Sequence, residues 1–415
     1  MNRPRVVISG LAGITPLANN IEDTWKALIA GKSGIGPITL FDASEYDSKI
    51  AGEVKNFNPE EFMPAKQVRR MDRFTQLAVA GAQMLLKDAN YTINDSNAFD
   101  VGVIMGIGLG GLHTLETWHT KLLESGPSRI SPFMIPMLIS NMGPGQVSIF
   151  TGAKGPNVVT TTACASGIHA IGTAYSEILL GRIKSAISGG VESTVTPLGV
   201  SGFTALKALS THYNDDPTHA SRPFDAKRDG FVIGEGAGLL FLENLDSAKE
   251  RGAKIYAEII GYGASGDAYH MTAPKEDGEG MIRAMHNALK EANISADAIE
   301  HINAHATSTQ LNDSTETTAI KKLFGSRANK IKISATKSMT GHLLGAAGGI
   351  ESVFTALALH DEILPGTINL ENPDPHCDLD YMADGSKKIA CEYAMCNSFG
   401  FGGTNASIIL KKWTN

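Results

Sequence analysis

Cys164 is the residue whose type and position most directly suggest chemistry. It follows the strand-like run VVTTT at 158–162 and precedes a helical run from Ile168 to about Leu180. Unpaired N–H groups and the positive end of the helix dipole stabilise a thiolate at such a helix start. Small residues at 165–167 leave room for another molecule to approach the sulfur. This stretch alone suits a nucleophile and a buried structural thiol equally well, and the stretches downstream decide between them.

Three further stretches, each at the end of a strand-like run, carry the other reactive groups. NAHATST holds His305, TKSMTGHLLGAAGG holds Lys337 and His342, and NSFGFGGTNAS holds Phe399 and Phe401. Two neutral imidazoles can donate N–H bonds to an oxyanion, and a nearby ammonium keeps them neutral. Glycines around Phe401 let its backbone N–H reach an acyl carbonyl beside the N–H of the cysteine. The combination predicts acyl transfer through a thioester.

The elements that must position these groups alternate between strands and helices. This alternation indicates an α/β protein with parallel or mixed sheets. The two parts of the chain show a loosely similar order of elements, without a detectable sequence repeat. We expect a boundary near residue 253, so that residues 1–253 hold the cysteine and residues 254–415 hold the histidines and the lysine.

The bulk composition argues against several classes of function. A net charge of -7 argues against general nucleic-acid binding. Four cysteines without CxxC spacing suggest neither a zinc site nor a disulfide framework. We see no secretory signal and no apolar run of membrane-spanning length, so we expect the cytoplasm. The loop GIGLGG at 106–111 is a weak phosphate-loop signal, and we interpret it as backbone that passes close to another segment.

The whole chain resembles the β-ketoacyl-acyl carrier protein synthases, the condensing enzymes of fatty acid synthesis, and most of all the type II elongating synthase. The matching motifs are TACASG, RDGFVIGEGAG, GDAYHMTAP, NAHATST, ATKSMTGHLLGAAGG, CNSFGFGGTNAS and PGTINLENPDPHCDLD. The resemblance implies a thiolase-like fold, in which two similar halves form a five-layered α-β-α-β-α core, and it implies a homodimer. It also implies an acyltransferase that condenses an acyl chain with malonyl-acyl carrier protein, with loss of carbon dioxide. Such a reaction needs no redox cofactor and no catalytic metal.

The same resemblance implies roles for the reactive residues. Cys164 would hold the acyl chain, His305 and His342 would assist decarboxylation, and Lys337 would support both histidines. The gating loop would contain Phe399, with Phe401 as the gate and oxyanion donor. The residue lining the acyl pocket beside this gate would be Leu109.

Contacts with the substrates and the carrier are implied in the same way. The pantetheine arm would lie beside Thr307, Thr309, His270 and Thr272. Three residues would reach the pocket from across the dimer, namely Phe133, Met134 and Met137. An acidic acyl carrier protein would dock on Lys66, Arg69, Arg70 and Lys207. Without such a partner, the basic cluster at 66–70 would be interpreted as a solvated helix face.

One motif departs from the family pattern. The family's NAHGTSTPxGD reads NAHATSTQLND here, so Ala306, Gln310 and Asn312 replace a glycine, a proline and a second glycine. A methyl group at 306 restricts the backbone and crowds the expected pantetheine tunnel. The departure therefore bears on substrate preference rather than on the reaction itself.

Three alternatives stay open. A specialised polyketide or aryl-polyene synthase would share the catalytic set and differ in its pocket lining. A thiolase would need a second cysteine as acid and base, for which Cys391 and Cys396 are the candidates. A non-catalytic chain-length partner would have lost the nucleophile, whereas Cys164 is intact.

Overall fold

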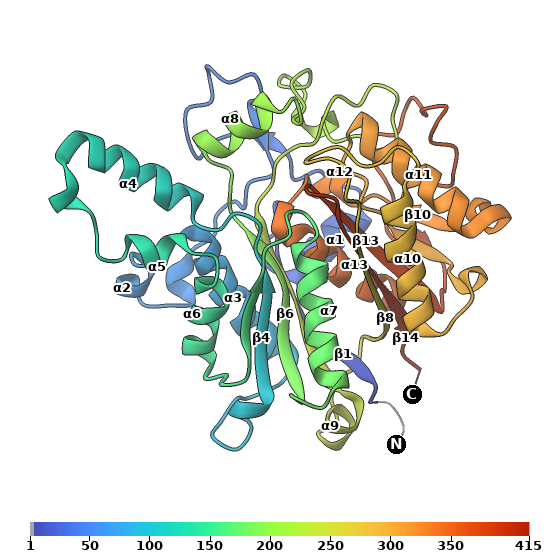
Figure 1. The fold of residues 1–415 in the computed structure, drawn as a ribbon, viewed down its shortest axis with the longest axis horizontal. Coiled ribbons are helices and arrows are strands. Elements are labelled where there is room, and N and C mark those ends of the chain that lie inside the picture. Colours follow the sequence, from blue (N-terminus) through green and yellow to red (C-terminus); the bar gives the residue numbers. More distant parts are fainter. Residues whose placement is uncertain (1–3, 415) are drawn as a thin grey trace.

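The computed structural model describes residues 4–414, and its main strands fall into two sets with one topology (Figure 1). The first set consists of β1 (Val6–Ile14), β4 (Val101–Gly106), β5 (Asn157–Thr160), β6 (Ser185–Glu192) and β7 (Gly236–Asn244). The second consists of β8 (Ala257–Gly266), β9 (His301–Asn303), β10 (Lys332–Ser334), β13 (Tyr393–Gly400) and β14 (Thr404–Lys412). The sheet orders are β5-β4-β6-β7-β1 and β10-β9-β13-β14-β8. If the five strands of each half are numbered in chain order, both sheets have the spatial order third, second, fourth, fifth, first.

The pairing directions also repeat. The first three strands of each order are parallel, and the last two pair antiparallel. The halves join where β1 pairs with β8 from Val6↔Ile259 to Ile8↔Ala257, which links ten strands by hydrogen bonds. Two small ribbons complete the strands: β2 (Gly36–Pro37) with β3 (Ile50–Ala51), and β11 (Ile363–Leu364) with β12 (Lys387–Lys388).

Helices cover both halves and fill the space between them. The central helices α7 (Ser166–Leu179) and α13 (Ala347–Asp361) contact each other and strands of both halves. The first half is covered on its outer face by α3 (Arg73–Asp88) and α6 (Met142–Thr151). The second half is covered by α10 (Glu279–Ala292), against which α11 (Gln310–Phe324) packs. These five layers confirm the predicted α/β fold of thiolase type.

Burial explains why α13 is apolar around most of its circumference. Every residue of α13 from Ala347 to Leu359 is buried, as expected for a helix enclosed on all sides. The start of α13 passes so close to α7 that a Cβ on Gly167 would lie 2.5 Å from the nitrogen of Gly349. Glycine is therefore required where the two helices begin, beside the cysteine.

The remaining helices lie at the periphery and in connections. They are α1 (Ile21–Ile29), α2 (Ala65–Val68), α4 (Leu112–Ser125), α5 (Met134–Leu138), α8 (Pro197–Ala205), α9 (Leu245–Glu250) and α12 (Lys337–Thr340). Between residues 4 and 414, no helix combines the length and apolarity needed to cross a membrane.

Glycines often mark turns, but β1 continues through Gly10 and Gly13 to Ile14. A Cβ on Gly10 would lie 2.7 Å from the Cβ of Ala89, and one on Gly13 would lie 2.9 Å from Ile350. These glycines allow close packing on a buried strand instead of a turn.

Candidate active site

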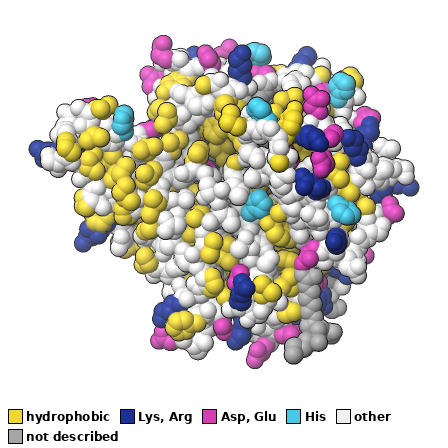
Figure 2. Space-filling model, viewed as in Figure 1, with side chains coloured by type: hydrophobic (Ala, Val, Ile, Leu, Met, Phe, Trp, Pro, Cys, Tyr) yellow, Lys and Arg dark blue, Asp and Glu magenta, His cyan; other side chains and the backbone are white. Residues whose placement is uncertain are grey.

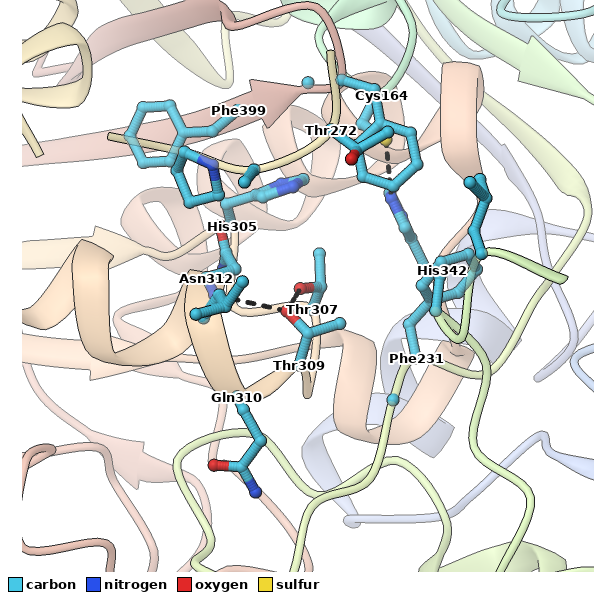
Figure 3. Close-up of a pocket in the computed structure, with 18 of the residues that line it drawn as sticks. Cys164, Phe231, Thr272, His305, Thr307, Thr309, Gln310, Asn312, His342 and Phe399 are labelled. Carbon is cyan, nitrogen blue, oxygen red and sulfur yellow. Dashed lines mark hydrogen bonds between the residues drawn. The ribbon is translucent and has the colours of Figure 1, made fainter. Parts of the chain in front are cut away.

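The reactive side chains all follow or end strands at the same edge of the sheets. Cys164 follows β5, His305 follows β9, Lys337 and His342 follow β10, and Phe401 follows β13. They surround or adjoin a cavity of about 290 Å³ (Figure 3). Its lining includes Cys164, Lys207, Thr272, His305, Thr307, Thr309, Gln310, Asn312, His342, Phe399 and Phe401. Carboxyl ends of parallel strands are the usual place for such a site.

The corner that holds Cys164 is tight. Ala163 adopts a left-handed conformation with φ of 49°, and α7 begins two residues after the cysteine. The hydroxyl of Ser166 donates to the carbonyl of Ala163 at 2.6 Å and accepts the N–H of Thr162 at 2.9 Å. These bonds close the turn and direct the sulfur into the cavity.

Burial dominates the ionisation of the thiol. It raises the pKa of Cys164 to about 11, although the charge of Lys337 and the backbone N–H groups of Phe401 and Cys164 lower it. The expectation that the helix start favours a thiolate is therefore wrong for the resting site, because desolvation outweighs these effects. Attack by this sulfur requires a base.

His342 is in position to be that base. Its Nε2 lies 3.0 Å from Sγ of Cys164, and the close-up shows the ring directed at the sulfur (Figure 3). Burial and the charge of Lys337 hold the pKa of His342 well below its usual value. The imidazole is thus neutral near pH 7 and can take up the thiol proton as the sulfur attacks.

Lys337 determines the tautomer of His305. Its Nζ lies 3.4 Å from Nδ1 of His305 and 2.5 Å from Oε1 of Glu351. An ammonium group has no acceptor, so Nδ1 must accept and the ring proton must lie on Nε2. Burial and the same charge hold the pKa of His305 well below its usual value. The two imidazoles, with centroids 5.4 Å apart, are neutral groups beside the sulfur.

The backbone of the Phe401 loop approaches the same sulfur. Its N–H and that of Cys164 both lower the pKa of the thiol, which places two donors around any group bonded to Sγ. The loop is held from outside the cavity, because Met271 accepts the N–H of Gly402 at 2.7 Å and Gly403 accepts the N–H of Asp267 at 2.9 Å. The left-handed φ values of Gly402 and Gly403, 83° and 66°, allow this path.

The sequence matches known families over most of its length. Residues 3–248 match the family described as Beta-ketoacyl synthase, N-terminal domain, and residues 256–371 match Beta-ketoacyl synthase, C-terminal domain. This chain belongs to the beta-ketoacyl synthase family.

Individual relatives of this beta-ketoacyl synthase cover its whole length. The 3-oxoacyl-[acyl-carrier-protein] synthase 2 of Synechocystis sp. is 52% identical over 413 residues, which span 100% of this chain and 99% of that protein. A solved beta-ketoacyl synthase from Burkholderia phymatum has a TM-score of 0.92 and 37% identity, over 99% of this chain and 100% of that one. A solved type II PKS acyl-carrier protein in complex with its hexaketide-bound ketosynthase has a TM-score of 0.90 and 32% identity, over 100% of both chains.

Some of the predicted substrate contacts of this synthase lie at the cavity. Thr307, Thr309, Thr272 and Lys207 line it, and the hydroxyls of Thr307 and Thr309 lie 3.0 Å apart. His270 is not among the lining residues. Its Nδ1 instead accepts the N–H groups of Thr272 and Ala273, each at 3.1 Å, so it shapes the loop that carries Thr272.

Other predicted residues lie outside this cavity. Leu109 is 50% exposed, and the residues expected to act across a dimer, Phe133, Met134 and Met137, lie on or beside α5. The basic residues expected to dock a carrier, Lys66, Arg69 and Arg70, lie on or just after α2. The guanidinium of Arg70 sits 4.4 Å from the ring centroid of Phe133, so the two groups share one surface.

Two of the three departures from the family pattern line the cavity, and the third, Ala306, directly follows His305. Ala306 is fully buried with φ of 37°, a conformation that a glycine adopts more easily. Gln310 donates to the carbonyl of Arg228 at 2.6 Å and its own carbonyl accepts from that guanidinium at 2.9 Å. Asn312 donates to Asp313 at 3.2 Å. Gln310 and Asn312 line the cavity and add polar groups there.

Sequence reasoning missed the buried carboxylates that hold the strand-end loops. Glu316 accepts the N–H groups of His305 and Ala306 at 2.9 and 2.8 Å, and Glu192 accepts several from the GIGLGG loop. Burial raises the pKa of Glu192, Glu316 and Glu351 to about 7 each. The sequence signal that could have revealed such a carboxylate is an acidic residue within an apolar run, as for Glu351 in GGIESVF.

The cavity also contains a possible set of metal ligands. The ligand atoms of Cys164, His305 and His342 all lie within 4.8 Å of one another, a composition that suits soft divalent ions. A metal ion on His305 would need a free lone pair on Nε2. Because Nδ1 accepts from Lys337, Nε2 carries the ring proton and has no free lone pair. The neighbouring ammonium therefore disfavours a metal here.

Proposed function

We propose that this synthase elongates fatty acyl chains on acyl carrier protein by decarboxylative Claisen condensation, in the cytoplasm. The carrying observation is the contact of 3.0 Å between His342 and the thiol of Cys164, beside a second imidazole whose Nε2 bears a proton. The family membership and the relative named 3-oxoacyl-[acyl-carrier-protein] synthase 2 support the same reaction.

In the loading step, Sγ of Cys164 attacks the carbonyl of an acyl-carrier thioester. Nε2 of His342 takes the thiol proton and returns it to the departing carrier thiolate. The tetrahedral oxyanion accepts the N–H groups of Cys164 and Phe401. The bond formed is Cys164–acyl, and the bond broken is acyl–carrier, so the step is neutral in charge.

In the second step, malonyl-carrier protein binds in the cavity and loses carbon dioxide. The resulting enolate oxygen accepts the Nε2–H of His305 and, in its Nε2–H tautomer, that of His342. The enolate carbon attacks the acyl-Cys164 carbonyl, the bond from Sγ to the acyl carbon breaks, and the departing thiolate takes up one proton from water. The step as a whole consumes one proton and releases carbon dioxide. The product is a 3-oxoacyl-carrier protein, two carbons longer.

Two of the three alternatives lack a corresponding feature in the structure. A thiolase needs a second cysteine at the cavity, but Cys391 and Cys396 are buried elsewhere and do not line it. Burial, followed by the charge of Glu351, raises the pKa of Cys396. An inactive chain-length partner would not need the contact between His342 and Cys164.

We propose a homodimer, supported by unequal sheet edges. The two equivalent edge strands differ, since β10 is largely buried whereas the first half of β5 is exposed. An open edge strand is a template for pairing. Exposed apolar side chains extend from it towards α4 and α5, where Figure 2 shows a hydrophobic surface. The exposed set includes Val158, Ile149, Ile139, Ile135, Phe133, Leu122 and Leu123.

We propose that acyl carrier protein docks on the basic residues already named. Among residues 4–414, no ion pair within 4 Å occupies Lys66, Arg69 or Arg70, so these charges are available to an acidic partner. Lys207 is exposed at the cavity itself. The solved complex of a related ketosynthase with its acyl-carrier protein supports a carrier as partner.

The test is elongation by the purified protein with acyl-carrier and malonyl-carrier substrates, followed by mass spectrometry of the carrier. We expect a gain of two carbons and a 3-oxo group, which Cys164→Ala abolishes. A series of acyl lengths and the corresponding CoA thioesters serve as comparisons. Elongation with CoA thioesters alone would overturn the carrier assignment, and extension without reduction through several cycles would favour the polyketide alternative.

A further inference from the structure

One buried carboxylate joins the connections on both sides of the active site. Glu192, at the end of β6, accepts N–H bonds from Gly108 at 2.7 Å and from Leu109 and Gly110 at 3.2 Å each. It also accepts the N–H of Gly345 at 3.2 Å. The first three donors follow β4, whereas Gly345 lies three residues after His342. A single side chain therefore ties the Leu109 loop to the connection that carries the base.

Two glycines allow this approach. A Cβ on Gly108 would lie 2.5 Å from Oε2 of Glu192, and a Cβ on Gly345 would lie 2.6 Å from it. Both contacts are too short, so a side chain at either position would displace the carboxylate. The GIGLGG loop thus wraps its backbone N–H groups around a carboxyl group of the same chain. This agrees with the interpretation of the loop as backbone that passes close to another segment.

Leu109 depends on this anchor for its position. Its side chain is half exposed, so packing does little to hold it. Its N–H contacts both oxygens of Glu192 at 3.2 Å. Displacement of the carboxylate would therefore release the loop around Leu109.

We propose that Glu192 is a positioning residue that fixes Leu109 relative to Cys164 and thereby sets which acyl chain lengths the cysteine accepts. This inference rests on the proposed function and on the role at the acyl pocket that the family resemblance implies for Leu109. The four groups that hold the carboxylate are all N–H donors, and Glu192→Gln would turn an amide N–H towards some of them. The variant keeps the volume of the side chain and loses part of its accepting capacity.

Glu53 offers a matched control. It is also buried, with 2% exposure, and accepts the N–H groups of Thr39 and Leu40 at 2.8 and 3.1 Å. It does not line the cavity. Glu53→Gln therefore makes the same chemical change in a loop that is not part of the active site.

The experiment compares the alkylation of Cys164 by iodoacetamide with its alkylation by an N-dodecyl iodoacetamide, whose tail needs the acyl pocket. In Glu192→Gln we expect the rate with the long reagent to fall roughly tenfold relative to the short one, since a misplacement of about 1 Å in a reacting site can cost up to about 10²-fold. The charge of Glu192 raises the pKa of Cys164, so its removal should not slow iodoacetamide. Thermal unfolding verifies that each variant is folded.

An unchanged ratio of the two rates in folded Glu192→Gln would overturn the proposal, as would an equal fall of the ratio in Glu53→Gln. A general weakening of the fold slows or speeds both reagents together, so the ratio separates positioning from stability. The alkylation needs no carrier and no malonyl group. Failure of the wild-type protein to elongate acyl chains would therefore refute the proposed function while leaving this measurement interpretable.

Discussion

The two halves repeat one strand order but differ in the connection from the third strand to the central helix. In the first half only residues 161–165 separate β5 from α7, whereas residues 335–346 separate β10 from α13. The short connection presents one thiol at a helix start. The longer one has room for α12, and it supplies both Lys337 and His342. The same topological position thus provides a nucleophile in one half and a base with its electrostatic support in the other.

The other equivalent strand ends differ in the same way. β4 leads to the Leu109 loop and β9 leads to His305, while β6 ends at Glu192 and β13 leads to Phe401. In the proposed reaction the first half supplies the nucleophile, and the second half supplies the two imidazoles and the Phe401 N–H. His342 belongs to the second half but contacts the thiol of the first, so it couples the two.

The largest expected effect comes from Cys164→Ala, which removes the reactive group of the first half. We expect condensation to fall by at least about 10⁴-fold, as for the loss of other catalytic nucleophiles. Malonyl decarboxylation should persist, because both imidazoles remain. Product mass and released carbon dioxide measure the two activities separately. Elongation that survives in this variant would contradict the division of labour between the halves.

A second comparison concerns the two histidines. His305→Ala should lower malonyl decarboxylation by roughly 10²–10³-fold, the usual range for an oxyanion donor, with acyl loading changed only a few-fold. His342→Ala should lower both activities, because it also removes the base that contacts the thiol. Loading is measured by the mass of the acylated protein. Equal behaviour of the two variants would show that His342 does not couple the halves.

The third prediction concerns pH. Lys337 lowers the pKa values of His305 and His342, so its removal raises both while burial continues to lower them. The double variant Lys337→Met/Glu351→Gln removes both members of the buried pair. In a plot of decarboxylation rate against pH, its loss of activity on the acid side should move to higher pH. The double variant avoids a buried unpaired carboxylate, which would cost about 3–5 kcal/mol. An unshifted pH profile in a folded variant would indicate that the ammonium does not control the imidazoles.

The sequence allowed prediction of the fold class and of which reactive side chains meet, for a physical reason. Each of these residues alone has a structural alternative, but four such strand ends in one chain rarely occur by chance, and their motifs are specific. The ionisation of Cys164 could not be predicted, because it depends on how completely the surrounding layers exclude water. Glu192 and Glu316 were missed for the same reason. Only the tertiary structure shows that these carboxylates are buried and face backbone N–H groups.

The smallest expected effect tests a similarity between the two corners. Ala163 beside Cys164 and Ala306 beside His305 both have left-handed φ values, 49° and 37°. A glycine would relieve about 1–2 kcal/mol of backbone strain and would lose roughly 0.5–1 kcal/mol through the greater freedom of the unfolded chain.

The two glycine variants should differ, because the methyl groups lie in different surroundings. Ala306 belongs to the buried core of the second half, whereas Ala163 is only partly buried. The loss of a buried methyl group costs about 0.8 kcal/mol. Ala306→Gly should therefore leave the free energy of unfolding nearly unchanged, whereas Ala163→Gly should raise it slightly. Chemical denaturation measures both free energies of unfolding. A stabilisation by Ala306→Gly that exceeds that of Ala163→Gly would show that the corner of His305 stores more strain than its packing recovers.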